Sequence, residues 1–253
     1  IFRYERIIER PEDSLVVATL APRETVEAAA DVRFRFFDPL TADLTFLSTR
    51  DLLDPAEAVA DPRVQRLIES ARASVGGMDL GWETNRQLRT HLGFRPRIVS
   101  WLRNDLDVTT VYRYDRNANF LERRPTGADT TLVLTRNVRG ERDWRLALAV
   151  DPRALAEALV GPPRPGEAAD MAQLRGMVGA LRPLQATYQA GVAARYNRDP
   201  VEPGSAFQWG WADRDQYRFL DADTAATLVD RSAWTLATGT RLPGGATVDL
   251  GYR

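Results

Sequence analysis

Strict alternation of apolar with polar or small residues between Leu184 and Tyr196 constrains the fold of this chain more than any other feature. A period of two places alternate side chains on opposite sides of an extended strand. The run covers about 13 residues, whereas globular strands mostly have about 5–6 and a tilted strand needs about 9–11 to cross a bilayer. The pattern favours a membrane-spanning strand, and a long hairpin of a soluble sheet is the alternative.

The residues on the two sides of this strand predict a different environment for each side. The apolar side consists of Leu184, Ala186, Tyr188, Ala190, Val192, Ala194 and Tyr196. The other side contains Gln185, Thr187, Gln189 and Arg195. Because a charge on the lipid face of a barrel is costly and a lumen position tolerates it, we expect the first side to meet lipid and the second to face a lumen.

Similar alternation recurs along the chain and predicts antiparallel hairpins between neighbouring strands. The predicted hairpins cover residues 31–49, 78–115, 129–150 and 232–252, with a weaker one within 1–23. The third hairpin would turn at Asn137-Val138-Arg139-Gly140. Loops are predicted at 115–128 and 221–230, and a loop or one helical turn at 24–30. The sequence thus predicts a mainly β fold, an antiparallel up-and-down meander of about 10–12 long amphipathic strands forming part of an outer-membrane β-barrel.

Helical patterns interrupt the strands in two places. Three Asp-Pro steps place an Asp N-cap before a Pro at the first helical position: Asp54-Pro55, Asp61-Pro62 and Asp151-Pro152. Helices are expected near 62–74, 152–160 and 167–181. We therefore predict that residues 1–253 form a single barrel segment, a fragment of a longer barrel, with helical insertions at about 54–75 and 152–181.

Composition narrows the function classes. The net charge of −1 provides no basic footprint for nucleic acid, so no nucleic-acid partner is expected. The absence of Cys excludes disulfides, a thiol nucleophile and Cys-based metal sites. All 34 basic residues are Arg, which GC-rich codon usage explains. No run approaches the ~18 apolar residues of a membrane helix, but this does not exclude membrane strands, whose hydropathy averages out.

Catalytic chemistry has little support in the sequence. His91 is the only His, and it lies on the polar side of a predicted strand between Arg89 and Arg95. It lacks the partner residues of a catalytic or metal site. The sequence therefore predicts that the protein is not an enzyme, that it has no cofactor, and that His91 is dispensable.

Pairs of acidic residues occur at three places in the sequence. The pairs are Asp51/Asp54, Asp213/Asp215 and Asp221/Asp223. Oxygen ligands suit Ca²⁺, but none of the three pairs has the spacing of an EF-hand loop. Solvated loops are predicted here, and calcium binding is the alternative.

Aromatic residues gather at or near the predicted strand ends. Phe207, Trp209 and Trp211 alternate with Gln208 and Gly210, which predicts a second strand that carries an aromatic girdle. The residues predicted at a membrane interface are Trp101, Tyr112, Tyr114, Trp144, Tyr196, Trp209, Trp211, Trp234 and Tyr252. Ordinary packing in a core or at a sheet edge is the alternative for them.

Three stretches together carry a resemblance to a known family. They are LSTRDL at 47–52, LGFRPRIVSWLRNDLDVTTVYRYDRN at 92–117, and LRPLQATYQ through YNRDPVEPGSAFQWGW within 181–211. In these stretches the chain resembles the SprA-type cell-surface proteins, the very large outer-membrane β-barrels of the type 9 secretion translocon, in a divergent, Arg-rich form. The likeness spans most of 41–253 and is weaker over 1–40.

The resemblance implies a non-enzymatic segment of a protein-export channel in the outer membrane, at the surface of a Gram-negative bacterium. It implies three kinds of partner: the lipid bilayer, exported protein cargo, and plug or accessory subunits of the translocon. The alternative function is a soluble or periplasmic antiparallel β-sheet domain that acts in binding or as a scaffold.

Overall fold

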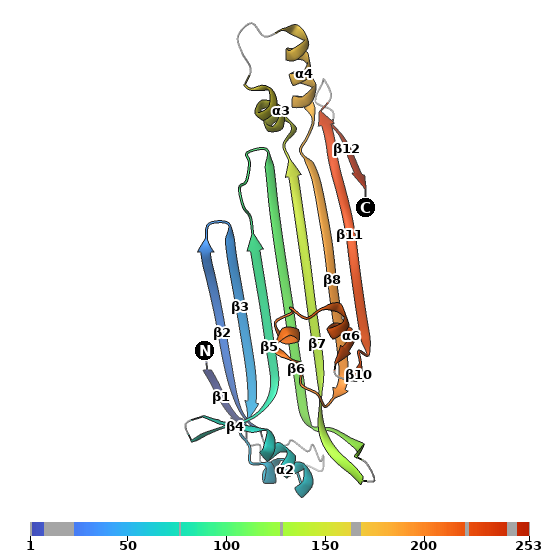
Figure 1. The fold of residues 1–253 in the computed structure, drawn as a ribbon. Helices are drawn as coiled ribbons and strands as arrows, with labels where there is room; N and C mark the ends of the chain where they lie inside the picture. Colours follow the sequence, from blue (N-terminus) through green and yellow to red (C-terminus); the bar gives the residue numbers. More distant parts are fainter. Residues whose placement is uncertain are drawn as a thin grey trace, which may run out of the picture.

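The fold is a long antiparallel sheet with helices at both ends of the strands (Figure 1). This computed structural model describes residues 2–7, 23–75, 77–126, 129–162, 168–220, 223–241 and 247–252. Ten strands form the main sheet, in the order β1-β2-β3-β5-β6-β7-β8-β11-β12, with β4 paired to β5. The predicted mainly β, up-and-down antiparallel fold is confirmed. The described strands form an open sheet with β1 and β12 at its edges.

Seven of the ten strands of the main sheet have 12 to 25 residues, which is long for a globular protein, and β1, β4 and β12 are short. They are β1 (Phe2–Ile7), β2 (Arg23–Phe37), β3 (Leu40–Asp51), β4 (Arg72–Val75), β5 (Met78–Phe94), β6 (Leu102–Thr126), β7 (Asp129–Val150), β8 (Leu184–Asp199), β11 (Thr227–Arg241) and β12 (Thr247–Tyr252). A separate two-stranded ladder joins β9 (Phe219–Leu220) to β10 (Asp223–Thr224).

The helices lie in the connections between strands, as predicted. They are α1 (Pro55–Ala58), α2 (Pro62–Ala71), α3 (Pro152–Val160), α4 (Ala169–Ala180), α5 (Ser205–Gln208) and α6 (Arg214–Arg218). The carboxylates of Asp54, Asp61 and Asp151 accept backbone N–H groups as the predicted N-caps. Helices lie within both predicted insertions, but the helix predicted near 62–74 ends at Ala71, because residues 72–75 form β4 and pair with β5. The helices α5 and α6 were not predicted. No helix among the described residues is long and apolar enough to cross a membrane.

Strand pairing overrides several local turn signals. The predicted turn Asn137–Gly140 is wrong because these residues lie inside β7, where Val138 is fully buried and pairs with Tyr114. The loop predicted at 115–128 is wrong because β6 continues to Thr126 against β7. Local composition favoured turns here, but long-range pairing and burial determine the outcome.

Three further predictions fail for related reasons. Residues 24–30 are strand, not loop or helix, because residues 24–28 pair with β1 and residues 25–30 pair with β3. The loop predicted at 221–230 is shorter, because β11 begins at Thr227. The aromatic strand predicted at 207–211 is instead α5 and a turn, in which Gly210 adopts a φ of 76°. Within 1–23, β1 is the first predicted arm, but the second, at 14–20, lies outside the described residues.

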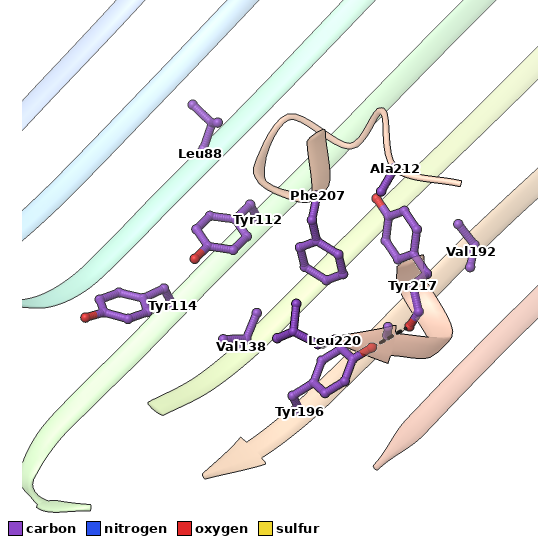
Figure 2. Close-up of a cluster of buried hydrophobic side chains, with 11 residues drawn as sticks. Leu88, Tyr112, Tyr114, Val138, Val192, Tyr196, Phe207, Ala212, Tyr217 and Leu220 are labelled. Atoms are coloured by element: carbon purple, nitrogen blue, oxygen red, sulfur yellow. Dashed lines mark hydrogen bonds between the residues drawn. The ribbon is translucent and has the colours of Figure 1, made fainter. Parts of the chain in front are cut away.

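The main core lies on one face of the sheet and covers only the lower half of that face in the view of Figure 1. Figure 2 shows the side chains of this core. A covering segment, residues 200–220, leaves β8 and carries α5 and α6 back over the strands. The Phe207 ring lies 6.3 Å from that of Tyr112, 6.2 Å from that of Tyr196 and 4.9 Å from that of Tyr217. A second, smaller cluster packs Val64 and Ile68 of α2 against Trp82.

Candidate functional site

Cross-strand register divides the side chains of the sheet into a polar face and an apolar face. On the polar face, one row of directly opposite residues, the ionic row, runs through Arg33, Asp43, His91, Thr109, Asp143, Gly191 and Arg231. The adjacent row on the apolar face, the boundary row, is Val32, Leu44, Thr90, Thr110, Arg142, Val192 and Asp230. Successive residues of a strand point to opposite faces, so these two rows lie at the same level of the sheet.

Above the boundary row, the apolar face of the described strands carries no charged side chain. On β7 it presents Trp144, Leu146, Leu148 and Val150, which cover ~20 Å at about 3.3 Å per residue. We name this surface the exposed band. Its exposed side chains include Phe34, Phe36, Leu92, Trp144, Leu184, Trp234, Leu236, Val248, Leu250 and Tyr252. Contiguous apolar surface of this kind marks a site of protein or membrane contact.

The two charges in the boundary row both hold the covering segment. Arg142 donates through Nη1 to the carbonyl oxygens of Gly210, at 3.2 Å, and Ala212, at 2.9 Å. Asp230 forms an ion pair with Arg214 of α6 at 2.7 Å. The upper limit of the covering segment therefore coincides with the lower limit of the uncharged band.

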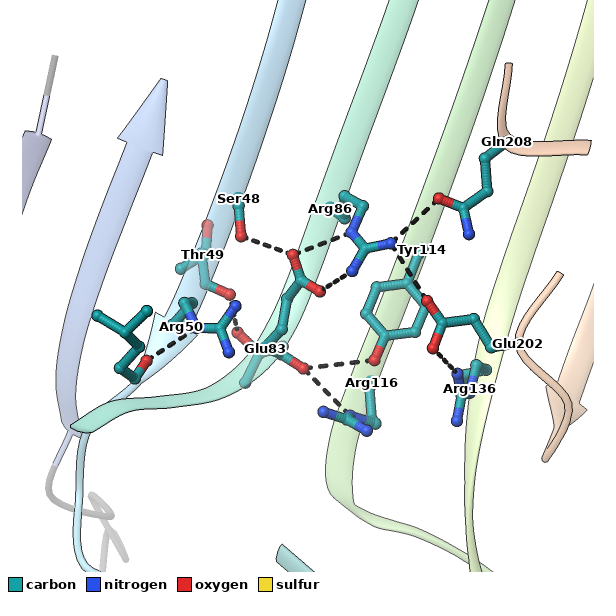
Figure 3. Close-up of polar contacts among 12 residues, drawn as sticks. Ser48, Thr49, Arg50, Glu83, Arg86, Tyr114, Arg116, Arg136, Glu202 and Gln208 are labelled. Carbon is teal, nitrogen blue, oxygen red and sulfur yellow. Dashed lines mark hydrogen bonds and ion pairs between the residues drawn. The ribbon is translucent and has the colours of Figure 1, made fainter. Parts of the chain in front are cut away.

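A network of polar side chains fixes the start of the covering segment below this level (Figure 3). Glu83 accepts hydrogen bonds from Ser48, at 2.6 Å, and from Arg86. Arg86 also donates to Glu202 at 3.2 Å, and Arg136 binds the other oxygen of the same carboxylate at 3.2 Å. Glu202 thus joins two strands to the covering segment through charge-assisted hydrogen bonds.

Burial shifts the acid–base properties of this lower region. It raises the pKa of the Tyr196 and Tyr217 phenols to about 12, because ionisation would place a charge in an apolar core. Burial lowers the pKa of Arg116, whose guanidinium stacks 4.8 Å from the Trp82 ring centroid. For Glu83, burial opposes ionisation, but hydrogen bonds from Arg86 and Ser48 hold its pKa below the usual value.

Two ion pairs on the polar face each join a pair of strands. Arg33 pairs with Asp43 at 2.5 Å, and Arg231 pairs with Asp143 at 2.6 Å. The second pair reaches over β8, because Gly191 stands directly between its partners and has no side chain. A Cβ at Gly191 would collide with the Asp143 carboxylate. Because Gly191 has no side chain, Asp143 of β7 and Arg231 of β11 can form an ion pair across β8.

His91 has different neighbours from those expected. Its Nδ1 lies 3.4 Å from Asp43 and its Nε2 lies 3.2 Å from Asp107. The sequence analysis placed His91 between Arg89 and Arg95, and cross-strand register adds carboxylates from β3 and β6. Arg95 donates to the same Asp107 oxygen that His91 contacts. Whether His91 is dispensable stays a prediction.

The structure separates the predicted interface aromatics into two groups. Tyr112, Tyr114 and Tyr196 are buried under the covering segment, so their side chains pack in a core and do not reach an interface. Val192 and Ala194, predicted to meet lipid, are buried there too. The remaining predicted aromatics are at least partly exposed: Trp101, Trp144, Trp209, Trp211, Trp234 and Tyr252.

The acidic pairs have local structural roles. Asp54 caps α1, Asp213 caps α6 in a reciprocal capping box with Gln216, and Asp51 accepts from the backbone N–H of Leu53. Asp221 lies outside the described residues. Within the described part of the chain, no group of three or more His and acidic residues is placed to hold a metal ion.

The sequence analysis predicted long strands with a polar and an apolar face, but it did not predict the covering segment. The signal available for it was the capping box of Asp213 and Gln216, which marks a helix start. No protein-family model, curated protein or solved structure matches the chain.

Proposed function

We propose that this chain is a wall segment of an outer-membrane β-barrel that forms a protein-export channel without enzymatic activity, in a SprA-type cell-surface protein. The exposed band carries the proposal. It extends without a charged residue across the strands from β2 to β12, on the face opposite the ionic row. Apolar-out, polar-in alternation with aromatic residues is the pattern of a transmembrane barrel wall.

The dimensions of the exposed band support a bilayer as its partner. Its height on β7, ~20 Å, is close to the apolar band of about 25 Å on outer-membrane barrels. A soluble sheet with this surface would need a second layer, since exposed apolar patches of this extent are rare on monomers. In this proposal the polar face lines an aqueous channel, which exported protein cargo and plug or accessory subunits contact.

A second candidate function is a soluble or periplasmic β-sheet domain for binding or scaffolding. One observation favours it: the covering segment already buries the lower half of the apolar face, as in a soluble protein. On this alternative, a protein partner covers the exposed band in place of lipid.

Single cysteines in the membrane-reconstituted protein test the proposal, and the native chain contributes no background because it has no Cys. A fluorophore at Leu236→Cys, in the exposed band, is expected to be quenched by lipid-phase quenchers. One at Gln189→Cys, on the polar face, should react with a water-soluble thiol reagent. Val192→Cys, beneath the covering segment, should be shielded from both. Reaction of Leu236→Cys with the water-soluble reagent, without lipid quenching, would support the soluble domain and overturn the barrel.

A further inference from the structure

The polar face carries two groups of arginines that outnumber the acidic side chains beside them. The upper group consists of Arg97, Arg103 and Arg145, which line a hollow of about 1260 Å³ near the β5–β6 connection. Within the described residues none of the three forms an ion pair. The lower group is Arg113, Arg139 and Arg195, directly opposite one another on β6, β7 and β8.

The lower group is unfavourable for the sheet by itself. Directly opposite residues have Cβ atoms about 4.5–5.5 Å apart, and like charges in such positions repel. Arg139 has an acidic partner in Glu141 at 3.2 Å, and Arg195 donates to the neutral side chain of Asn197. Arg113 has no acidic partner among the described residues. An anion laid across this row would relieve the repulsion through charge-assisted hydrogen bonds.

The distance between the two groups indicates a polymer and not a small ion. Arg145 and Arg139 lie on the same face of β7, separated by ~20 Å at about 3.3 Å per residue. A single phosphate or carboxylate contacts one group only. An extended chain with several negative charges reaches both.

The carboxylates close to the arginine groups determine which class of anionic polymer the polar face can bind. Asp143 lies on the polar face between the two groups, and Asp107 lies directly opposite Arg145 at the lower limit of the upper group. Asp143 also accepts from Arg231, and Asp107 from Arg95, so a bound chain would share these carboxylates with the arginines. The two carboxylates would repel a chain with a charge on every unit, such as a nucleic acid, but they can accept backbone N–H groups of a polypeptide. We propose that the polar face binds an acidic, extended polypeptide segment, with its carboxylates at the arginine groups and its backbone N–H groups at Asp107 and Asp143. The inference rests on the proposed export function and assigns the cargo a charge class.

The test measures binding of a fluorescent peptide of alternating Glu and Ser to the whole chain in detergent micelles. A Lys-Ser peptide, an oligonucleotide of equal charge and inorganic phosphate serve as competitors. Arg113→Gln, Arg139→Gln and Arg195→Gln together should weaken binding by about tenfold, since charge-assisted contacts are lost. The matched control removes three exposed helix arginines, Arg63, Arg66 and Arg153, and should leave binding unchanged.

Each remaining outcome bears on the inference. Arg113→Gln should raise the melting temperature, because it relieves like-charge repulsion and breaks no ion pair among the described residues; a fall would indicate a structural role and count against a ligand site. Equal displacement by phosphate would reduce the site to a small-anion site, and stronger displacement by the oligonucleotide would make it a nucleic-acid surface. Either result overturns the peptide inference. Lipid quenching at Leu236→Cys reports on the barrel separately, so failure of the inference leaves the proposed function standing.

Discussion

The upper and lower halves of the same apolar face differ in what covers them. In the lower half, the chain itself supplies a second layer, and Tyr112, Tyr196 and Tyr217 are almost fully buried. In the upper half, Leu184 at the other end of β8 is 39% exposed, Trp234 of β11 is 61% exposed and Leu250 of β12 is 65% exposed. The change occurs at the boundary row, where charges first appear. Burying an unpaired charge is costly, so these charges are found where the covering segment offers partners.

The same alternating sequence pattern occurs in two environments, one exposed and one covered by another part of the chain. Along β8, apolar residues alternate without interruption from Leu184 to Tyr196, yet Leu184 is exposed and Tyr196 is buried. Local periodicity specifies which face is apolar, but what covers that face depends on a segment elsewhere in the chain.

Truncation of a buried ring in the lower half should have the largest effect. Tyr217→Ala removes a fully buried side chain that contacts Phe207, and should lower the free energy of unfolding by about 3–5 kcal/mol. The control Trp234→Ala removes an exposed ring from the upper half and should cost less than about 1 kcal/mol in detergent. Denaturant unfolding followed by fluorescence measures both, and equal losses would contradict the division into halves.

The Glu83 carboxylate should make the lower half sensitive to acid. Its pKa in the folded protein lies below the usual 4.5, so its stabilising contribution is present above pH 4.5 and is lost as the pH falls further. Glu83→Gln should cost about 1–3 kcal/mol at neutral pH, because Ser48 and Arg86 lose their charged partner. Below pH 4.5 the difference from the native protein should shrink. The exposed pair Glu122–Arg124 provides the control, and Glu122→Gln should show no such trend.

A Gly→Ala substitution should affect stability differently at a glycine beneath the covering segment and at a glycine that is exposed. Gly140 lies beneath the covering segment, and a Cβ there would come within 2.5 Å of Phe207 Cζ and 3.1 Å of Tyr217 Cε1. Gly140→Ala should therefore destabilise the protein by about 1–3 kcal/mol through overpacking. Gly251 of β12 lies on the polar face, which the covering segment does not reach, and the nearest atom to such a Cβ is 3.9 Å away. Gly251→Ala should therefore change stability by no more than about 0.5 kcal/mol. Thermal unfolding of the two variants gives the comparison.

Sequence reasoning could identify the hairpins and the Asp-Pro helix starts because their signals are local. The alternation in β3, β5 and β8 and the caps at Asp61 and Asp151 needed no distant contact. The same reasoning failed where distant contacts decide. Gly140 resembles a turn residue, but its role is to leave room for Phe207, which lies far away in sequence.

The candidate site was predictable in part. The apolar side of β8 was identified correctly, but its lower end was assigned to lipid because nothing near Val192 indicates that the covering segment lies over it. The ionic row was not predicted, since each of its members comes from a different strand and only the register brings them together. The position of His91 between two carboxylates is a product of that register.

Removal of a phenol hydroxyl should have opposite effects at two tyrosines of the covered core. The Tyr196 hydroxyl donates to the Tyr217 carbonyl oxygen at 3.0 Å, so Tyr196→Phe should cost about 1 kcal/mol. The Tyr217 hydroxyl is buried without a partner among the described residues, and Tyr217→Phe should be neutral or stabilising. Chemical denaturation distinguishes the signs. A loss at Tyr217 equal to that at Tyr196 would show that its hydroxyl has a partner in solution.

The smallest effect is expected for the exposed ion pair on the polar face. Asp143 and Arg231 are joined over Gly191, and their side chains are 41% and 59% exposed. Water and salt screen such a pair, so a double-mutant cycle of Asp143→Asn and Arg231→Gln should give a coupling of about 0.2–1 kcal/mol that disappears near 1 M salt. Gly191→Ala should abolish the same coupling while both charged residues are kept, because its Cβ would occupy the position of the Asp143 carboxylate and displace it. A coupling that survives both high salt and Gly191→Ala would mean that the polar face is shielded from water. An aqueous channel lining would then be contradicted at this level of the sheet.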